Sequence, residues 1–105
     1  MSSNDRLREL KADLLKALGQ PTRLKILELL TDGERCVCEI FPAINEEQSN
    51  ISKHLAFLRS QGIVIADRRG TRVFYRLVDP QILSVLAEIE KCVRGILTSK
   101  ASLAA

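Results

Sequence analysis

Among the segments of this chain of 105 residues, 63–77 limits the possible folds most. Its apolar and polar residues alternate as in two β-strands joined by a tight turn. The predicted strands cover 63–67 and 72–77, and the tip between them reads Arg-Arg-Gly-Thr. Gly70 can adopt the positive φ that such a tip needs. The other periodic segments repeat at helical spacing, so we expect a mostly α protein of the α+β class.

Apolar residues at helical spacing predict four helices before this hairpin and one after it. Pro21 suits the first turn of the second helix, since its missing N–H has no partner there in any case. Asn45 is expected to cap the fourth helix, whose first turn then holds Glu46 and Glu47. The predicted helices cover 5–18, 21–30, a brief stretch from 37, 46–60, and 80 to about 97.

The length predicts a single domain over residues 1–105, with 98–105 as a disordered tail. An apolar fraction of 46% is typical of a folded globular chain, and no apolar stretch is long enough for a membrane span or a signal core. Three cysteines are too few for a disulfide scaffold. We therefore expect a cytoplasmic protein in a reducing compartment, with no membrane partner and no permanently bound cofactor.

Positive charge is concentrated in residues 50–76, although the whole chain has a net charge of only +3. That window holds six Lys or Arg side chains and a single acidic one, Asp67. The segments on either side are slightly acidic or neutral. Because the basic window includes the hairpin tip, we expect a polyanion to dock there.

The predicted fourth helix has one face suited to reading DNA. Its apolar residues Ile51, Leu55 and Leu58 share one side, which leaves short polar side chains on the opposite side. Such a helix fits the major groove, and arginines on a following hairpin reach phosphates or the adjacent minor groove. The pattern therefore predicts a winged helix-turn-helix that binds DNA. His54 lies just beside the polar face, where a phosphate or structural hydrogen-bond partner is expected rather than a metal ligand.

Four segments together resemble the arsenical-repressor (ArsR/SmtB) family of bacterial and archaeal metal-sensing repressors, over roughly residues 12–80. They read LKALGQPTRLKILELL, ERCVCEI, SNISKHLAFLRSQGIV and RRGTRVFYRL. The resemblance implies a transcriptional repressor with four helices, two strands and a final helix, which leaves its operator when an inducer binds. It also implies two groups of DNA-binding residues, namely Gln48, Ser49, Ser52, Lys53 and His54 in the helix, and Arg68, Arg69 and Arg72 in the wing.

A homodimer is expected from the apolar residues as well as from the resemblance. The first helix carries a leucine stripe and segment 79–97 carries a continuous apolar seam, which is more apolar surface than one small monomer covers. The resemblance places the dimer seam on these same two helices. Two reading helices about one DNA turn apart then require double-stranded DNA with a pseudo-palindromic operator.

Cys36 and Cys38 are the predicted sensing residues. They begin the third helix, where unpaired N–H groups and the helix dipole favour thiolates. Residues i and i+2 of a regular helix point apart, so capture of one ion by both requires an irregular helix start. Thiolates prefer soft or thiophilic ions such as arsenite, antimonite, cadmium, lead or mercury. In the family that the chain resembles, Cys-Val-Cys at this place marks the thiolate type of site, and arsenite is the expected inducer.

Two departures from the family's patterns reduce the number of metal ligands that this chain can offer. Phe41 stands one helical turn after the cysteine pair, where some arsenic-responsive members have a third cysteine. The zinc ligands that other members carry on the last helix are incomplete, since Gln81 follows Asp79 where a histidine is needed. Cys92 is expected to be a small apolar residue of the dimer seam, with a third thiolate ligand as the alternative.

Three other functions are compatible with parts of the sequence. The cysteine pair of the same repressor can instead be a redox or persulfide switch. The basic wing can bind a protein in place of DNA. A binding assay with promoter DNA at several salt concentrations distinguishes a DNA partner from a protein partner. An enzyme is the weakest interpretation, because the sequence offers His54 no triad or metal partner and contains no glycine-rich phosphate loop.

Overall fold

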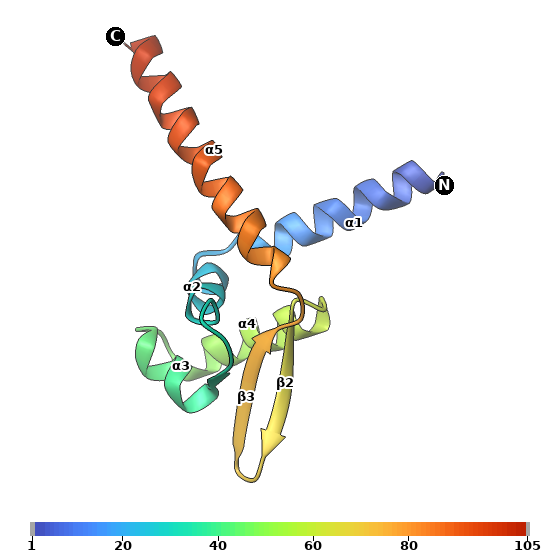
Figure 1. Cartoon of the computed structure of the whole chain (residues 1–105), viewed down its shortest axis with the longest axis vertical. Helices are drawn as coiled ribbons and strands as arrows, with labels where there is room; N and C mark the ends of the chain where they lie inside the picture. Colours follow the sequence, from blue (N-terminus) through green and yellow to red (C-terminus); the bar gives the residue numbers. More distant parts are fainter. Residues whose placement is uncertain (1, 105) are drawn as a thin grey trace.

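A computed structural model describes residues 2–104, which form a winged helix-turn-helix with a small antiparallel sheet (Figure 1). The predicted class, α+β and mostly α, is confirmed. The helices are α1 (Ser3–Leu18), α2 (Pro21–Leu29), α3 (Val37–Ala43), α4 (Gln48–Ser60) and α5 (Gln81–Ala104), and the strands are β1 (Arg35–Cys36), β2 (Val64–Arg69) and β3 (Arg72–Leu77).

Local capping explains where the first two helices begin. Ser2 accepts a hydrogen bond from the backbone N–H of Asp5, and the Asp5 carboxylate accepts one from the backbone of Ser2. The side chain of Gln20 caps α2 by accepting a hydrogen bond from the N–H of Arg23. Pro21 occupies the first turn of α2, as the sequence predicted.

Asn45 does not cap α4, so the sequence analysis was wrong on this point. Glu47 is the N-cap residue, and its side chain makes no cap bond. Ile44 is extended and buried, and its carbonyl accepts a hydrogen bond from the N–H of Glu46. The buried Ile44 therefore holds Asn45 in a tight turn, and the chain becomes helical only from Gln48.

The sheet has the strand order β1-β3-β2, and both pairs are antiparallel. β1 is a third strand, in addition to the two strands of the hairpin that the sequence predicted. In β1, Arg35 pairs with Tyr75 and Cys36 pairs with Phe74 of β3. The segment that carries Cys36 is therefore part of the same sheet as β2 and β3, the hairpin that forms the wing.

The hairpin is longer and its turn is tighter than predicted. β2 and β3 stay in register up to the pair Arg69 and Arg72, which leaves a turn of two residues. Gly70 has a φ of 64° in this turn, a conformation that favours glycine. Arg68 and Arg69 therefore belong to β2, whereas the sequence analysis placed them in the tip.

The hydrophobic core lies between α2, α3, α4 and the base of the hairpin. Side chains that are almost completely buried there come from each of these elements: Ile26, Leu27, Ile40, Ile51, Leu55, Leu58 and Val64. The three from α4 lie on one side of that helix, as the sequence predicted. Because that side packs against the core, the opposite side of α4 faces solvent.

α5 is longer than the sequence predicted. We expected an end near Leu97 and a disordered tail over 98–105, but the helix continues to Ala104, and residue 105 lies outside the described residues. Residues 98–104 contain no Gly or Pro that would stop a helix. Within residues 2–104, no helix is long and apolar enough to span a membrane.

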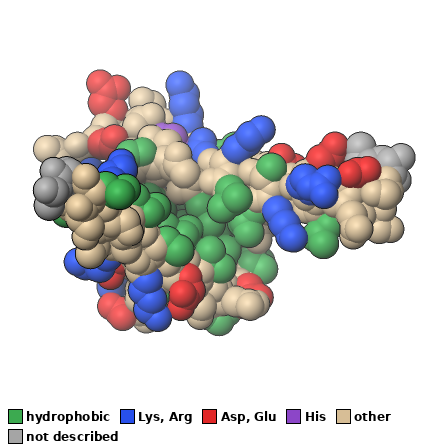
Figure 2. Space-filling view, turned by 90° about the horizontal axis from the view of Figure 1, so that it is seen from above, with side chains coloured by type: hydrophobic (Ala, Val, Ile, Leu, Met, Phe, Trp, Pro, Cys, Tyr) green, Lys and Arg blue, Asp and Glu red, His purple; other side chains and the backbone are tan. Residues whose placement is uncertain are grey.

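α1 and α5 extend away from the core in different directions (Figure 1). Large apolar side chains remain exposed on both, including Leu15 at 60%, Ile96 at 54% and Leu97 at 60%. Figure 2 shows apolar side chains gathered in the angle between the two helices. Exposed apolar surface costs about 25 cal/mol per Å², so this surface favours a partner that covers it.

Candidate nucleic-acid interface and thiol site

The polar face of α4 is open to solvent along its first two turns. Gln48, Ser49, Ser52 and Lys53 are all exposed, while Ile51 on the opposite side is fully buried. The structure thus brings together four of the residues that the sequence analysis assigned to DNA reading. Their amide, hydroxyl and ammonium groups are donors and acceptors of the kind that contact base edges in the major groove.

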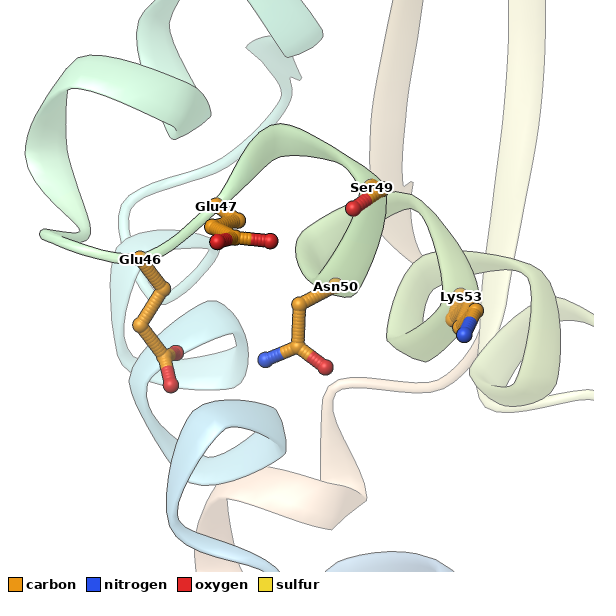
Figure 3. Close-up of a pocket in the computed structure, with 5 residues that line it drawn as sticks. All are labelled: Glu46, Glu47, Ser49, Asn50 and Lys53. Carbon is orange, nitrogen blue, oxygen red and sulfur yellow. The ribbon is translucent and has the colours of Figure 1, made fainter.

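The charge changes sign between the two residues that precede α4, Glu46 and Glu47, and Lys53 in its second turn. A surface hollow of about 350 Å³ lies at this end of the helix. Figure 3 shows the residues that line it, Glu46, Glu47, Ser49, Asn50 and Lys53. The carboxylate of Glu46 accepts a hydrogen bond from the buried hydroxyl of Thr22, which anchors it beside α2. A DNA phosphate is therefore favoured beside Lys53 and disfavoured beside the two carboxylates.

His54 makes a structural contact with α2, as one of its two expected roles predicted. Its Nδ1 accepts a hydrogen bond of 3.1 Å from Nε of Arg23. Burial, and then the positive charge of Arg23, lower the pKa of His54, against the opposing effect of Glu46. A neutral ring is what this contact requires, because Nδ1 must keep its lone pair.

Arg23 is a structural residue that the sequence analysis missed. Its Nη1 donates to the carbonyls of Lys16 and Ala17 at the end of α1, and its guanidinium lies 4.0 Å from the ring centre of Phe57. Together with the bond to His54, these contacts connect α1, α2 and α4. Its position in the first turn of α2 gives no sequence signal for this role.

The arginines of the wing are not equally available to a phosphate. Arg68, Arg72 and Arg76 are exposed and make no ion pair within the described residues. Arg69, in contrast, donates to both carboxylate oxygens of Glu34 at 2.6 and 2.7 Å, and to Asp67 at 3.0 Å. Its guanidinium also lies over the ring of Phe74 at 4.5 Å. These hydrogen bonds, that to Glu34 foremost, raise the pKa of Arg69.

The two cysteines of Cys-Val-Cys meet at the junction between β1 and α3. Cys36 is extended, with φ −68° and ψ 142°, and is the N-cap residue of α3. Its sulfur accepts a hydrogen bond from the N–H of Cys38, and the two sulfurs are joined as a disulfide. The irregular helix start that joint binding of an ion requires is therefore present. Cys36 is buried and Cys38 is exposed.

Cys92 lies apart from this pair. It is a free cysteine on the exposed surface of α5. Among residues 2–104, no group of three or more His, Cys, Asp or Glu side chains is placed to hold a metal ion. Within one chain, the donors available for a thiophilic ion are therefore the sulfurs of Cys36 and Cys38, once their disulfide is reduced.

Comparison with known proteins identifies related regulators. Residues 20–66 match the family described as bacterial regulatory protein, arsR family. The chain is 40% identical over 84 residues to an uncharacterised HTH-type transcriptional regulator of Methanocaldococcus jannaschii, an alignment that covers 79% of this chain and 94% of that one. It is 42% identical over 78 residues to the arsenic resistance transcriptional regulator ArsR2 of Pseudomonas putida, covering 73% and 67%.

A solved structure has the same fold. It is the homodimeric winged helix-turn-helix DNA-binding domain of a possible ArsR-family transcriptional regulator from Mycobacterium bovis, determined by NMR in solution. The TM-score is 0.79 and the sequence identity is 34%. The match covers 92% of this chain and 91% of that one.

Proposed function

Because the chain belongs to the arsR family of bacterial regulatory proteins, which are DNA-binding transcriptional regulators, we propose that it is a homodimeric repressor released from its operator by arsenite. The observation that carries the proposal is the position of the two sulfurs. They meet where β1, a strand paired with the wing, passes into α3, which leads to the reading helix α4. A change at the pair acts on both parts of the DNA-binding surface.

The proposed DNA contacts follow from exposure and charge. Gln48, Ser49 and Ser52 of α4 read base edges, while Lys53 contacts a phosphate. In the wing, Arg68 and Arg72 have no carboxylate partner in the described structure and contact the backbone. His54 stabilises the position of α4 through its hydrogen bond with Arg23 of α2.

The proposed dimer buries the exposed apolar surfaces of α1 and α5. Two copies related by a twofold axis present two α4 helices to the same side of a duplex, so the operator is pseudo-palindromic. The homodimeric relative from Mycobacterium bovis supports this arrangement, since it has the same fold over nearly the whole chain.

Arsenite suits the pair because it forms bonds to sulfur without a change in oxidation state. Each thiol gives its proton to one hydroxyl of As(OH)₃, an As–S bond forms, and water leaves. Two thiols therefore bind one arsenic atom with the loss of two waters. The arsenic atom then retains one hydroxyl, which a further thiol, from a small molecule or from Cys92 of the partner chain, can replace.

Mass spectrometry of the reduced protein tests this site. After arsenite is added, we expect one arsenic atom per chain in the wild type and in Cys92→Ser, and none in Cys36→Ser or Cys38→Ser. Serine keeps the size of the side chain but has no anionic form near neutral pH, so it cannot replace a thiolate toward a soft ion. Arsenic retained by the Cys36→Ser, Cys38→Ser double variant, and lost from Cys92→Ser, would move the site to α5.

A second candidate function uses the same pair as a thiol switch. The disulfide between Cys36 and Cys38 favours it, because one residue separates the cysteines and the junction already brings their sulfurs together. In this case peroxide takes two electrons from the thiols, the S–S bond forms, and peroxide leaves as two waters. The two candidates differ in what releases the operator: arsenite under reducing conditions for the first, and peroxide or polysulfide without arsenite for the second.

A further inference from the structure

Arg69 connects the cysteine segment to the wing by two routes that form a closed ring. Along the chain, Cys36 lies two residues from Glu34, and both carboxylate oxygens of Glu34 accept hydrogen bonds from Arg69. Across the sheet, Cys36 pairs with Phe74, and the guanidinium of Arg69 lies over the ring of Phe74. The two routes from the sensing cysteine therefore end on the same guanidinium.

The geometry points to the Arg69–Glu34 ion pair as the contact through which the state of the cysteine pair acts on the wing. This inference rests on the proposed function for its inducer. Arg69 is then a positioning residue, and Arg72 at the same level of the hairpin is a phosphate contact. A bidentate guanidinium–carboxylate pair suits this role because it fixes distance and orientation together.

Binding at the cysteines has a direct route to this pair. Cys36 is buried, so an arsenic atom bonded to both sulfurs needs space that only a movement of the junction provides. Glu34 precedes this junction by two residues and moves with it. Its carboxylate then carries Arg69, and with it the end of β2, to a new position.

Glu34→Gln tests the contact, because it removes the charge that holds Arg69 but keeps the shape of the side chain. Asp67→Asn is the matched control, since Asp67 binds the same guanidinium from within the wing. Operator affinity is measured by fluorescence anisotropy on reduced protein, with and without arsenite. We expect arsenite to weaken binding about tenfold or more in the wild type and Asp67→Asn. In Glu34→Gln, the factor by which arsenite weakens operator binding should be at least threefold smaller. The urea midpoints of the three proteins should agree, which shows that the variants are equally stable.

The salt dependence of operator binding separates positioning from phosphate contact. Arg72→Ala should lower the slope of log affinity against log salt by about 0.9, the loss of one phosphate contact. Arg69→Ala should leave the slope unchanged, because Arg69 is bound to two carboxylates and makes no phosphate contact in this arrangement. An equal loss of slope in both variants overturns the positioning role.

An arsenite-independent measurement keeps the coupling contact separate from the identity of the inducer. Linkage is reciprocal, so operator DNA must also act on the cysteine segment. In reduced protein, we expect the operator to change the rate at which iodoacetamide alkylates the thiol of the exposed Cys38 at least threefold in the wild type and Asp67→Asn, but not in Glu34→Gln. Peptide mass spectrometry separates Cys38 from Cys92, which is also exposed. No change in the wild type, or the same change in Glu34→Gln, overturns the coupling contact. If the alkylation result holds and arsenite releases nothing, only the proposed inducer is wrong.

Discussion

Single residues of like charge have different partners in this protein, and we expect different roles for them. Arg69 and Arg72 face each other across the hairpin, yet only Arg69 is held by carboxylates. The sequence predicted both as DNA contacts from their charge and their place in the basic window. It could not distinguish them, because the main partner of Arg69 is Glu34, 35 positions earlier, and exposed charged pairs leave no periodic pattern.

The lowered pKa of His54, which burial and then the charge of Arg23 cause, predicts a pH dependence of stability. The folded protein lowers the pKa of His54 from its ordinary value of 6.5, so near that pH the unfolded chain binds more protons than the folded one. Stability is then full above about pH 6.5 and falls as the pH drops through the interval between the two pKa values. His54→Asn offers an acceptor at a similar place but does not titrate.

Urea unfolding at several pH values between about 5.5 and 7.5 measures this effect, in an interval where histidine is the side chain that titrates. We expect the wild type to lose stability toward the acid end and His54→Asn to lose less. An identical decline in both proteins would show that another group is responsible.

Among the elements, those with a strong internal pattern were predicted well. The apolar spacing in α4 gave its buried side, and with it the exposed polar face, directly from the sequence. The hairpin followed from its alternation and Gly70. The start of α4 was missed because a buried Ile44, a tertiary feature, outweighs the local preference of Asn45 for an N-cap. β1 was missed because two residues are too short to show alternation.

We predict that α4 supplies specificity and the wing supplies general affinity. Ser52→Ala or Gln48→Ala should cost about 1 to 3 kcal/mol on the operator and little on random DNA, since base edges are read from this face. Arg72→Ala should weaken binding to both kinds of DNA, because phosphates carry no sequence information. Competition binding with the operator and a scrambled duplex measures both. Equal losses on the two duplexes for Ser52→Ala would contradict the assignment of base reading to α4.

At the scale of the whole molecule, we assign dimer formation to the two projecting helices, α1 and α5, and inducer sensing to the junction that carries the two thiols. α1 and α5 carry the exposed apolar surface, and in the proposed dimer their packing sets the spacing of the two α4 helices on DNA. The junction between β1 and α3 lies within each chain. It pairs with strand β3 of the wing on one side, and α3 connects it to α4 on the other. An inducer at this place can weaken DNA binding in each half of the dimer without separating the dimer.

The release of operator DNA by arsenite in cysteine variants tests this account most directly. Fluorescence anisotropy of reduced protein on its operator should show tight binding for the wild type, for Cys92→Ser and for the Cys36→Ser, Cys38→Ser double variant. Arsenite should then release the wild type, and Cys92→Ser at least in part, while the double variant stays bound. A double variant that still leaves the DNA when arsenite is added would contradict the account, and would place the sensor at Cys92 on α5.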